Sequence, residues 1–320
     1  MARADLLVSL VRSGIRGDKV AFRKVAEALA SEEQAKGHKI LYKRLAESIA
    51  ANGNGNGHGY NISKVQQKNL FYEIEPERRL SSMFLAKVVT EQVEDLIEEQ
   101  HRADLLHSHN LTARNRLLLA GPPGNGKTSL AEAIATELMV PLIVIRYEGL
   151  IGSYLGETAS RLQQVIDYAK TQRCVLFIDE FETIGKERGD TNETGEIKRL
   201  VSSLLLQIDN LPDYVIVIAA SNHPELLDKA VWRRFQIRLE LAMPTRTQTS
   251  KFIESICKRT KIEFGLSPET MAKKLYGANF AEIEEVCLSI VRKIILSRDY
   301  NKSKGITNRL ITQWQQRFKP

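Results

Sequence analysis

One eight-residue segment constrains the fold of this chain more than any other. Residues 121–128 read Gly-Pro-Pro-Gly-Asn-Gly-Lys-Thr, the pattern G-x-x-x-x-G-K-[ST], and they stand between a strand-like apolar stretch and a helix-like one. Glycines let backbone N–H groups converge on phosphate oxygens, and the N-terminus of the following helix adds partial positive charge. The segment therefore predicts a nucleotide-phosphate site at a strand-to-helix turn, formed by Gly121, Pro122, Pro123, Gly124, Asn125, Gly126, Lys127, Thr128 and Ser129.

Two acids extend the chemistry of this site. Lys127 is a flexible point charge for the β- and γ-phosphates, and the Thr128 hydroxyl can bind Mg²⁺. Asp179 and Glu180 follow the apolar stretch Cys174–Ile178, where carboxylates are costly unless they have a function. We expect Asp179 to bind Mg²⁺ and Glu180 to orient and polarise the attacking water, since phosphoryl transfer depends on positioning and electrostatics. The predicted reaction is Mg²⁺-dependent hydrolysis of ATP to ADP and phosphate.

Strand-like and helix-like stretches alternate over the middle of the chain. Short, continuous apolar stretches are typical of strands buried on both faces of a parallel sheet, and helix-like stretches separate them, so we predict an α/β domain with helices on both faces. The predicted strands are Arg116–Ala120, Leu142–Arg146, Cys174–Ile178 and Val215–Ala220. After Pro244 only helices are predicted, at Gln248–Lys258, Pro268–Tyr276, Phe280–Leu296 and Ile306–Phe318.

An alternation of Asn and Gly divides the chain. Residues 52–59 contain no apolar side chain, so residues 51–62 are predicted to be a flexible linker. Residues 1–50 repeat apolar residues at helical spacing and predict a bundle of three short helices. Residues 63–243 are then the large α/β part, and residues 244–320 a small helical part.

The composition indicates the class of protein and its compartment. The chain is 43% hydrophobic and 27% charged, near the average of globular proteins. No stretch approaches the ~18 apolar residues of a membrane span, and we do not expect a signal peptide. Three distant cysteines, Cys174, Cys257 and Cys287, fit a reducing compartment. We expect a soluble, cytoplasmic protein without metal-binding cysteines.

Charge is unevenly distributed. Residues 1–50 carry ten Lys and Arg against six Asp and Glu, and residues 244–320 carry fifteen against seven, while the whole chain has a net charge of +7. The middle is therefore acidic. Contact with nucleic acid or an acidic protein is one interpretation; solvation of helix surfaces is the other, and the scatter of the basic residues favours it.

With these motifs in place, residues 85–295 resemble the AAA ATPases, which implies a P-loop AAA+ domain with a small all-helical lid. Residues 216–222, Ile-Val-Ile-Ala-Ala-Ser-Asn, look like the sensor strand, which makes Asn222 a contact for water or the γ-phosphate. Residues 227–235 look like the arginine-finger segment and are most similar to the katanin, spastin and ESCRT-disassembling group. The resemblance implies that Arg233 and Arg234 reach the ATP of a neighbouring subunit in a homo-oligomer, typically a hexamer.

Further resemblances concern the target. Residues 153–157, Ser-Tyr-Leu-Gly-Glu, resemble the first pore loop, so Tyr154 and Leu155 are implied to grip a polypeptide, and Arg188–Glu196 lies where the second pore loop is expected. Residues 276–283 look like the start of a lid helix, with Phe280 in place of glycine. Contacts to the adenine base are expected near Leu85–Thr90, without assignment to single residues. Residues 1–50 resemble an adaptor bundle that recruits a protein.

Three functions follow from this reading. The leading one is an ATP-driven motor that threads, unfolds or disassembles a protein recruited through residues 1–50, with a partner protease as one setting. The alternative is a nucleic-acid-associated ATPase, such as a loader or transposition helper, that uses the basic C-terminal part. The third is a nucleotide-dependent binding switch, against which Glu180 and the paired arginines argue.

Overall fold

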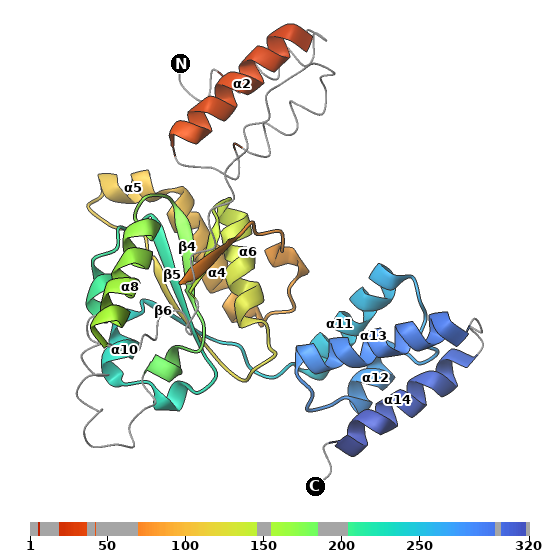
Figure 1. The fold of residues 1–320 in the computed structure, drawn as a ribbon. Helices are drawn as coiled ribbons and strands as arrows, with labels where there is room; N and C mark the ends of the chain where they lie inside the picture. Colours follow the sequence, from red (N-terminus) through yellow and green to blue (C-terminus); the bar gives the residue numbers. More distant parts are fainter. Residues whose placement is uncertain are drawn as a thin grey trace, which may run out of the picture.

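The computed structural model describes Leu6, residues 19–36, Tyr42, and residues 70–145, 155–184, 204–297 and 302–317. In this part of the chain a mixed α/β body precedes a group of helices (Figure 1). Before the body lies α2 (Lys19–Ala35), the second of the three predicted N-terminal helices. Most of the remaining N-terminal segment and the Asn/Gly linker lie outside the described residues, so the three-helix bundle and the linker stay predictions.

A six-stranded sheet forms the centre of the body. Its order is β1-β3-β4-β5-β2-β6, and only β1 runs antiparallel to its neighbour, β3. The strands are β1 (Phe71–Ile74), β2 (Arg116–Ala120), β3 (Leu142–Ile145), β4 (Cys174–Ile178), β5 (Val215–Ser221) and β6 (Ile237–Glu240). The mostly parallel α/β fold is confirmed, and the four predicted strands are its inner members.

The two edge strands, β1 and β6, were not predicted, and their burial explains why. In β6 buried and exposed residues alternate, and in β1 only Phe71 is fully buried. Edge strands with one face open to water lack the continuous apolar stretch that marks an inner parallel strand. β6 still matters to the site, because it pairs with β2, the strand that leads into the phosphate loop.

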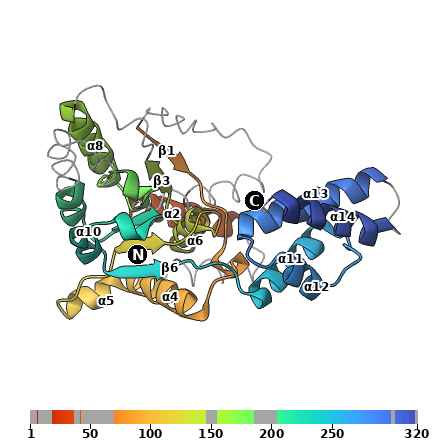
Figure 2. The same cartoon turned by 90° about the horizontal axis from the view of Figure 1, so that it is seen from below.

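Helices cover both faces of the sheet, as the view from below shows (Figure 2). One face packs a cluster that includes Val165 and Ile166 of α8, and the other packs a cluster that includes Leu96 of α4 and Ile134 of α6. The helical segments of the body are η1 (Leu80–Ser82), α4 (Lys87–His101), α5 (Ala103–Ser108), α6 (Lys127–Leu138), α8 (Leu155–Ala169), η2 (Phe181–Ile184), η3 (Pro224–Leu226) and α10 (Lys229–Arg234).

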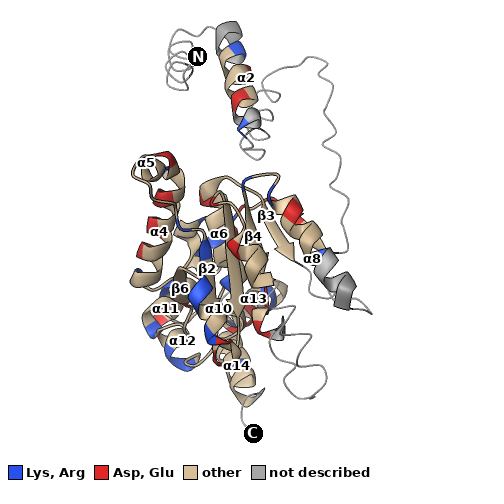
Figure 3. Cartoon of the chain, turned by 90° about the vertical axis from the view of Figure 1, so that its left-hand side faces the viewer, with Lys and Arg blue, Asp and Glu red and all other residues tan. Residues whose placement is uncertain are grey.

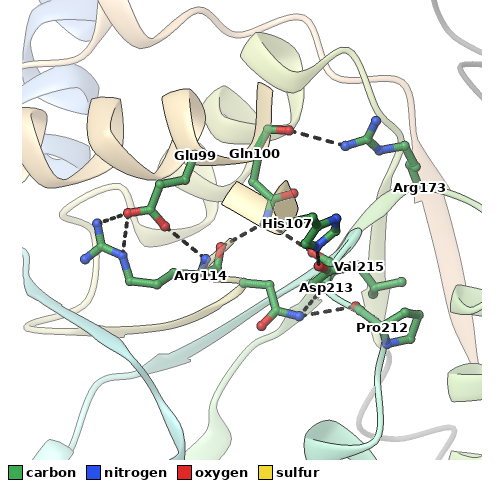
Figure 4. Close-up of polar contacts among 9 residues, drawn as sticks. Glu99, Gln100, His107, Arg114, Arg173, Pro212, Asp213 and Val215 are labelled. Carbon is green, nitrogen blue, oxygen red and sulfur yellow. Dashed lines mark hydrogen bonds and ion pairs between the residues drawn. The ribbon is translucent and has the colours of Figure 1, made fainter. Parts of the chain in front are cut away.

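Side-chain hydrogen bonds and ion pairs cluster at the end of the sheet where its parallel strands begin (Figure 4). The Gln100 side chain, only 3% exposed, donates from Nε2 to the carbonyl oxygens of Arg114 at 2.9 Å and Asp213 at 3.1 Å. His107 Nε2 lies 2.6 Å from Asp213 Oδ2, and Glu99 pairs with Arg114. Buried backbone groups at this edge thus gain side-chain partners.

The four helices predicted after Pro244 are present and surround a core of their own. Ile253, Met271, Ile283 and Ile290 are among its buried members. The helices are α11 (Arg246–Thr260), α12 (Pro268–Lys274), α13 (Phe280–Ser297) and α14 (Ser303–Arg317); their ends differ from the predicted ends by a few residues. We call them the lid helices.

Acidic and basic side chains gather on different helices (Figure 3). Acidic residues such as Glu94 and Asp95 lie along α4, whereas Lys273 and Lys274 lie on α12. Within the described residues, no helix is long and apolar enough to cross a membrane.

Candidate nucleotide-binding site

All of the predicted phosphate-binding residues except Gly121 and Pro122 line a cavity of about 950 Å³ where the sheet meets the lid helices. The carboxyl ends of parallel strands meet at one edge of a sheet, which is where α/β proteins bind ligands. Of the predicted residues, the cavity is lined by Pro123, Gly124, Asn125, Gly126, Lys127, Thr128, Ser129, Asp179, Glu180 and Asn222. The structure thus brings together residues that follow β2, β4 and β5.

Two glycines of the phosphate loop are enforced by close contacts. Gly121 has φ +136°, and a Cβ there would lie 2.4 Å from the carbonyl oxygen of Leu241. Gly124 has φ +76°, and a Cβ there would lie 2.7 Å from Asn279 Oδ1. The carbonyl oxygen of Gly124 accepts a hydrogen bond from the Ala281 N–H at 3.1 Å. The loop therefore touches both the strand extension after β6 and the first turn of α13.

Lys127 is held inside the site. Its side chain is buried, and Nζ donates to the carbonyl oxygens of Gly121 at 2.7 Å and Pro122 at 3.0 Å and to Asn222 Oδ1 at 2.6 Å. Burial lowers the pKa of Lys127, and the nearby carboxylates of Asp179 and Glu182 oppose that effect. The lysine and the predicted sensor amide are thus direct neighbours.

The two acids after β4 are held in different ways. Asp179 is half-buried, and its Oδ1 accepts the backbone N–H of Glu180 at 2.9 Å. Glu180 is exposed and has φ +47°, a left-handed conformation that disfavours side chains other than glycine and asparagine. Such strained residues concentrate at functional sites, and the cavity wall includes both acids.

The donor set fits a magnesium ion. Thr128 supplies a hydroxyl oxygen and Asp179 a carboxylate, and Mg²⁺ takes oxygen ligands while retaining places for water and phosphate. Among the described residues there is no cluster of three or more His, Cys, Asp or Glu that could hold a metal by itself.

Aromatic side chains border the same cavity and join the body to the lid helices. Phe84 contacts Phe252 with ring centres 5.4 Å apart, and Phe252 contacts Phe280 at 5.1 Å. Gln248, which forms a capping box with Thr245 at the start of α11, also donates to the Phe84 carbonyl oxygen at 3.0 Å. Phe84 and Phe252 were not predicted as site residues, because single phenylalanines in distant elements give no local signal. Within the neighbourhood predicted for the base, Leu85 lines the cavity.

The two predicted arginines lie away from this cavity at the end of α10. Arg233 is exposed and has no side-chain partner within the described residues. Arg234 is half-buried and forms an ion pair with Asp209, Nε to Oδ2 at 2.8 Å, while Asp209 Oδ1 also binds Arg116 at 2.5 Å. Within the described residues, an ion pair therefore holds Arg234 in place but not Arg233.

Other predicted residues remain untested. Tyr154 and Arg188–Glu196 lie outside the described residues. Leu155 begins α8, and its side chain is also outside the description. Because α8 starts at Leu155, Gly156 and Glu157 of the segment that resembles the first pore loop are helical.

Comparison with known proteins identifies the domain around this cavity. Residues 117–243 match the family model "ATPase family associated with various cellular activities (AAA)". The uncharacterised AAA family ATPase y4kL of Sinorhizobium fredii is 35% identical over 304 residues, which cover 93% of this chain and 91% of that protein.

Other relatives match a smaller part of their length. A putative 26S proteasome regulatory subunit homologue of Methanothermobacter marburgensis is 33% identical over 54% of this chain and 47% of its own. The ATP-dependent zinc metalloprotease FtsH 1 of Salinibacter ruber is 32% identical over 62% of this chain and 30% of its own. The chain thus spans half or less of these two relatives.

Proposed function

The chain belongs to the AAA family of ATPases, and we propose that it hydrolyses ATP with Mg²⁺ in the cavity between the sheet and the lid helices to remodel a protein target. The observation that carries the proposal is the convergence of Lys127, Asp179, Glu180 and Asn222 on one cavity. An ATPase needs this combination of a phosphate-binding cation, acids and an oriented amide.

In the proposed arrangement the phosphates lie against the loop before α6. Lys127 would exchange its carbonyl partners for phosphate oxygens, and Thr128 and Asp179 would hold the magnesium ion. A magnesium ion bound there would neutralise phosphate charge during transfer. The base would lie among Phe84, Phe252 and Phe280, since aromatic rings offer faces for a purine.

The water is assigned to the two side chains that follow β4 and β5. Glu180 would accept a proton from the attacking water, and the Asn222 amide would hold the water or the γ-phosphate oxygen. A general base contributes ~10²–10⁴-fold to a rate. Charge that develops on the phosphate would be met by Arg233 of an adjacent subunit, because a guanidinium meets phosphate oxygens bidentately and stays charged.

Relatives support a protein as the target. Two of them are named as a proteasome regulatory subunit homologue and as a zinc metalloprotease. We propose that residues 1–50 recruit the target and that Tyr154 and Leu155 grip it in the centre of a homohexamer. A partner protease would then act on the threaded chain.

The test separates this motor from a nucleic-acid-associated ATPase. We expect Tyr154→Ala to retain basal ATP hydrolysis and to lose target remodelling, with Tyr154→Phe as the matched control that keeps the aromatic ring. DNA and RNA should leave hydrolysis unchanged. Strong stimulation by DNA that falls steeply with salt, as counterion release requires, together with an unaffected Tyr154→Ala variant, would favour the nucleic-acid function.

A further inference from the structure

The turn after Glu180 contains a buried acid to which the proposed reaction gives no role. Glu182, in η2, is only 3% exposed. Its Oε1 accepts a hydrogen bond from the backbone N–H of Asn222 at 3.0 Å, whereas its Oε2 is buried without a hydrogen-bond partner among the described residues. A carboxylate in such a place costs free energy unless its environment compensates. Among the described residues, the hydrogen bond from the Asn222 N–H is the one that the Glu182 side chain forms.

That hydrogen bond joins the two loops that carry the proposed water-binding groups. Glu182 lies two residues after Glu180 on the turn that follows β4, and Asn222 directly follows β5. The strands β4 and β5 are paired in parallel, so their carboxyl ends are adjacent. The bond from Asn222 to Glu182 thus fixes the spacing of the loops beyond the last strand pair.

The same turn is anchored on a second side. Phe181 is fully buried and packs edge-to-face on Phe235, with ring centres 5.9 Å apart. Phe235 directly follows the arginine helix α10. Two consecutive buried side chains, Phe181 and Glu182, therefore hold the turn against two neighbouring loops while Glu180 stays exposed.

Glu182 lies behind the cavity rather than on its wall. From this region the lining residues are Asp179, Glu180 and Asn222. Glu182 still acts on the site through charge, because its carboxylate opposes the lowering of the Lys127 pKa by burial. On its other side Asn222 reaches Lys127 through its Oδ1 atom. The contacts therefore run from Glu182 through Asn222 to the phosphate-binding lysine.

We propose that Glu182 is a positioning residue for hydrolysis, whose carboxylate holds the Asn222 backbone so that the Asn222 amide and the Glu180 carboxylate keep their spacing around the water. The inference rests on the proposed ATPase function. It assigns Glu182 no contact with ATP, and it predicts an effect on turnover rather than on nucleotide binding.

The test compares Glu182→Gln with Glu182→Leu in the full chain. Both side chains resemble glutamate in volume, but only glutamine retains an acceptor for the Asn222 N–H. We expect Glu182→Leu to lower kcat by about ten- to a hundredfold, since a small misplacement of reacting groups costs up to about a hundredfold. The Kd for ATP should stay close to the wild-type value, and Glu182→Gln should recover most of the lost kcat.

Gln100→Leu is the matched control, because Gln100 has the same 3% exposure and also binds backbone groups, but at the opposite edge of the sheet. It should lower the unfolding temperature without lowering kcat per folded molecule. Wild-type kcat in Glu182→Leu, or an equal loss of kcat in Glu182→Gln and Glu182→Leu, would overturn the positioning role. Wild-type protein and Glu180→Gln are measured alongside: if the wild type does not hydrolyse ATP, it is the proposed function that fails.

Discussion

Among single residues, Arg233 and Arg234 are neighbours in the sequence but differ in their contacts. Both stand in a segment that resembles an arginine finger, and their spacing gives no reason to prefer one. The structure separates them, because Asp209 binds Arg234 and Arg116, whereas Arg233 is exposed. Asp209 lies far from both arginines in the sequence, so no local pattern could reveal the pair.

We therefore expect Arg233→Ala to lose more turnover than Arg234→Ala. An arginine that stabilises transferred phosphate is worth on the order of 10³-fold or more in kcat, and the exposed Arg233 side chain has no partner among the described residues that would hold it back from a neighbouring subunit. Arg234→Ala should mainly weaken the tie to Asp209, a partly exposed ion pair worth about 1 kcal/mol or less. Steady-state ATPase rates and thermal unfolding of the two variants check this, and a larger kcat loss in Arg234→Ala would reverse the assignment.

At the scale of elements, the inner strands and the lid helices could be predicted because their apolar patterns are continuous or periodic. The edge strands β1 and β6 could not, since one of their faces is open. The contact between the phosphate loop and α13 was also beyond sequence reasoning. It depends on Gly124 meeting Asn279, and only packing of the lid helices brings them together.

One glycine substitution, Gly124→Ala, tests this contact, and two others serve as controls. Gly124→Ala adds a Cβ within 2.7 Å of Asn279 at φ +76°, whereas Gly277→Ala has a similar φ of +89° with nothing within 4 Å. Gly305→Ala, in α14, also meets nothing within 4 Å, and should stabilise the lid helices by about 0.5 kcal/mol.

We expect Gly124→Ala alone to weaken ATP binding by roughly tenfold, equivalent to about 1.4 kcal/mol. Titration with a fluorescent ATP analogue measures this, and thermal unfolding measures the stability of each variant. Gly277→Ala should bind ATP like the wild type, and an equally unchanged affinity in Gly124→Ala would contradict a role for the lid contact in ATP binding.

For the molecule as a whole, the proposed ATPase depends on assembly of several subunits. The cavity of one chain contains the phosphate loop and both acids, yet Arg233 and Arg234 lie away from it. The resemblance to AAA proteins predicted this separation, because it assigned the arginines to a neighbour's ATP. In the N-terminal part α2 is present, and the bundle that would recruit a target remains a prediction.

Mixed oligomers test action between subunits. Chains that carry both Arg233→Ala and Arg234→Ala should be inactive, and so should Lys127→Ala chains. When the two are mixed, some interfaces pair an intact arginine segment with an intact phosphate loop, so partial ATPase activity should return. Persistent inactivity in oligomers shown to contain both chains would argue against action in trans.

Deletion of residues 1–50 should leave basal hydrolysis and remove target recruitment.

The proposed hydrolysis is tested by a single-turnover measurement with Glu180→Gln, in which bound ATP is measured in the same samples. Glutamine keeps the size of the side chain but removes the charge that polarises water. We predict that the variant binds ATP as tightly as the wild type and that hydrolysis slows by at least about a hundredfold. Hydrolysis at the wild-type rate would contradict the account.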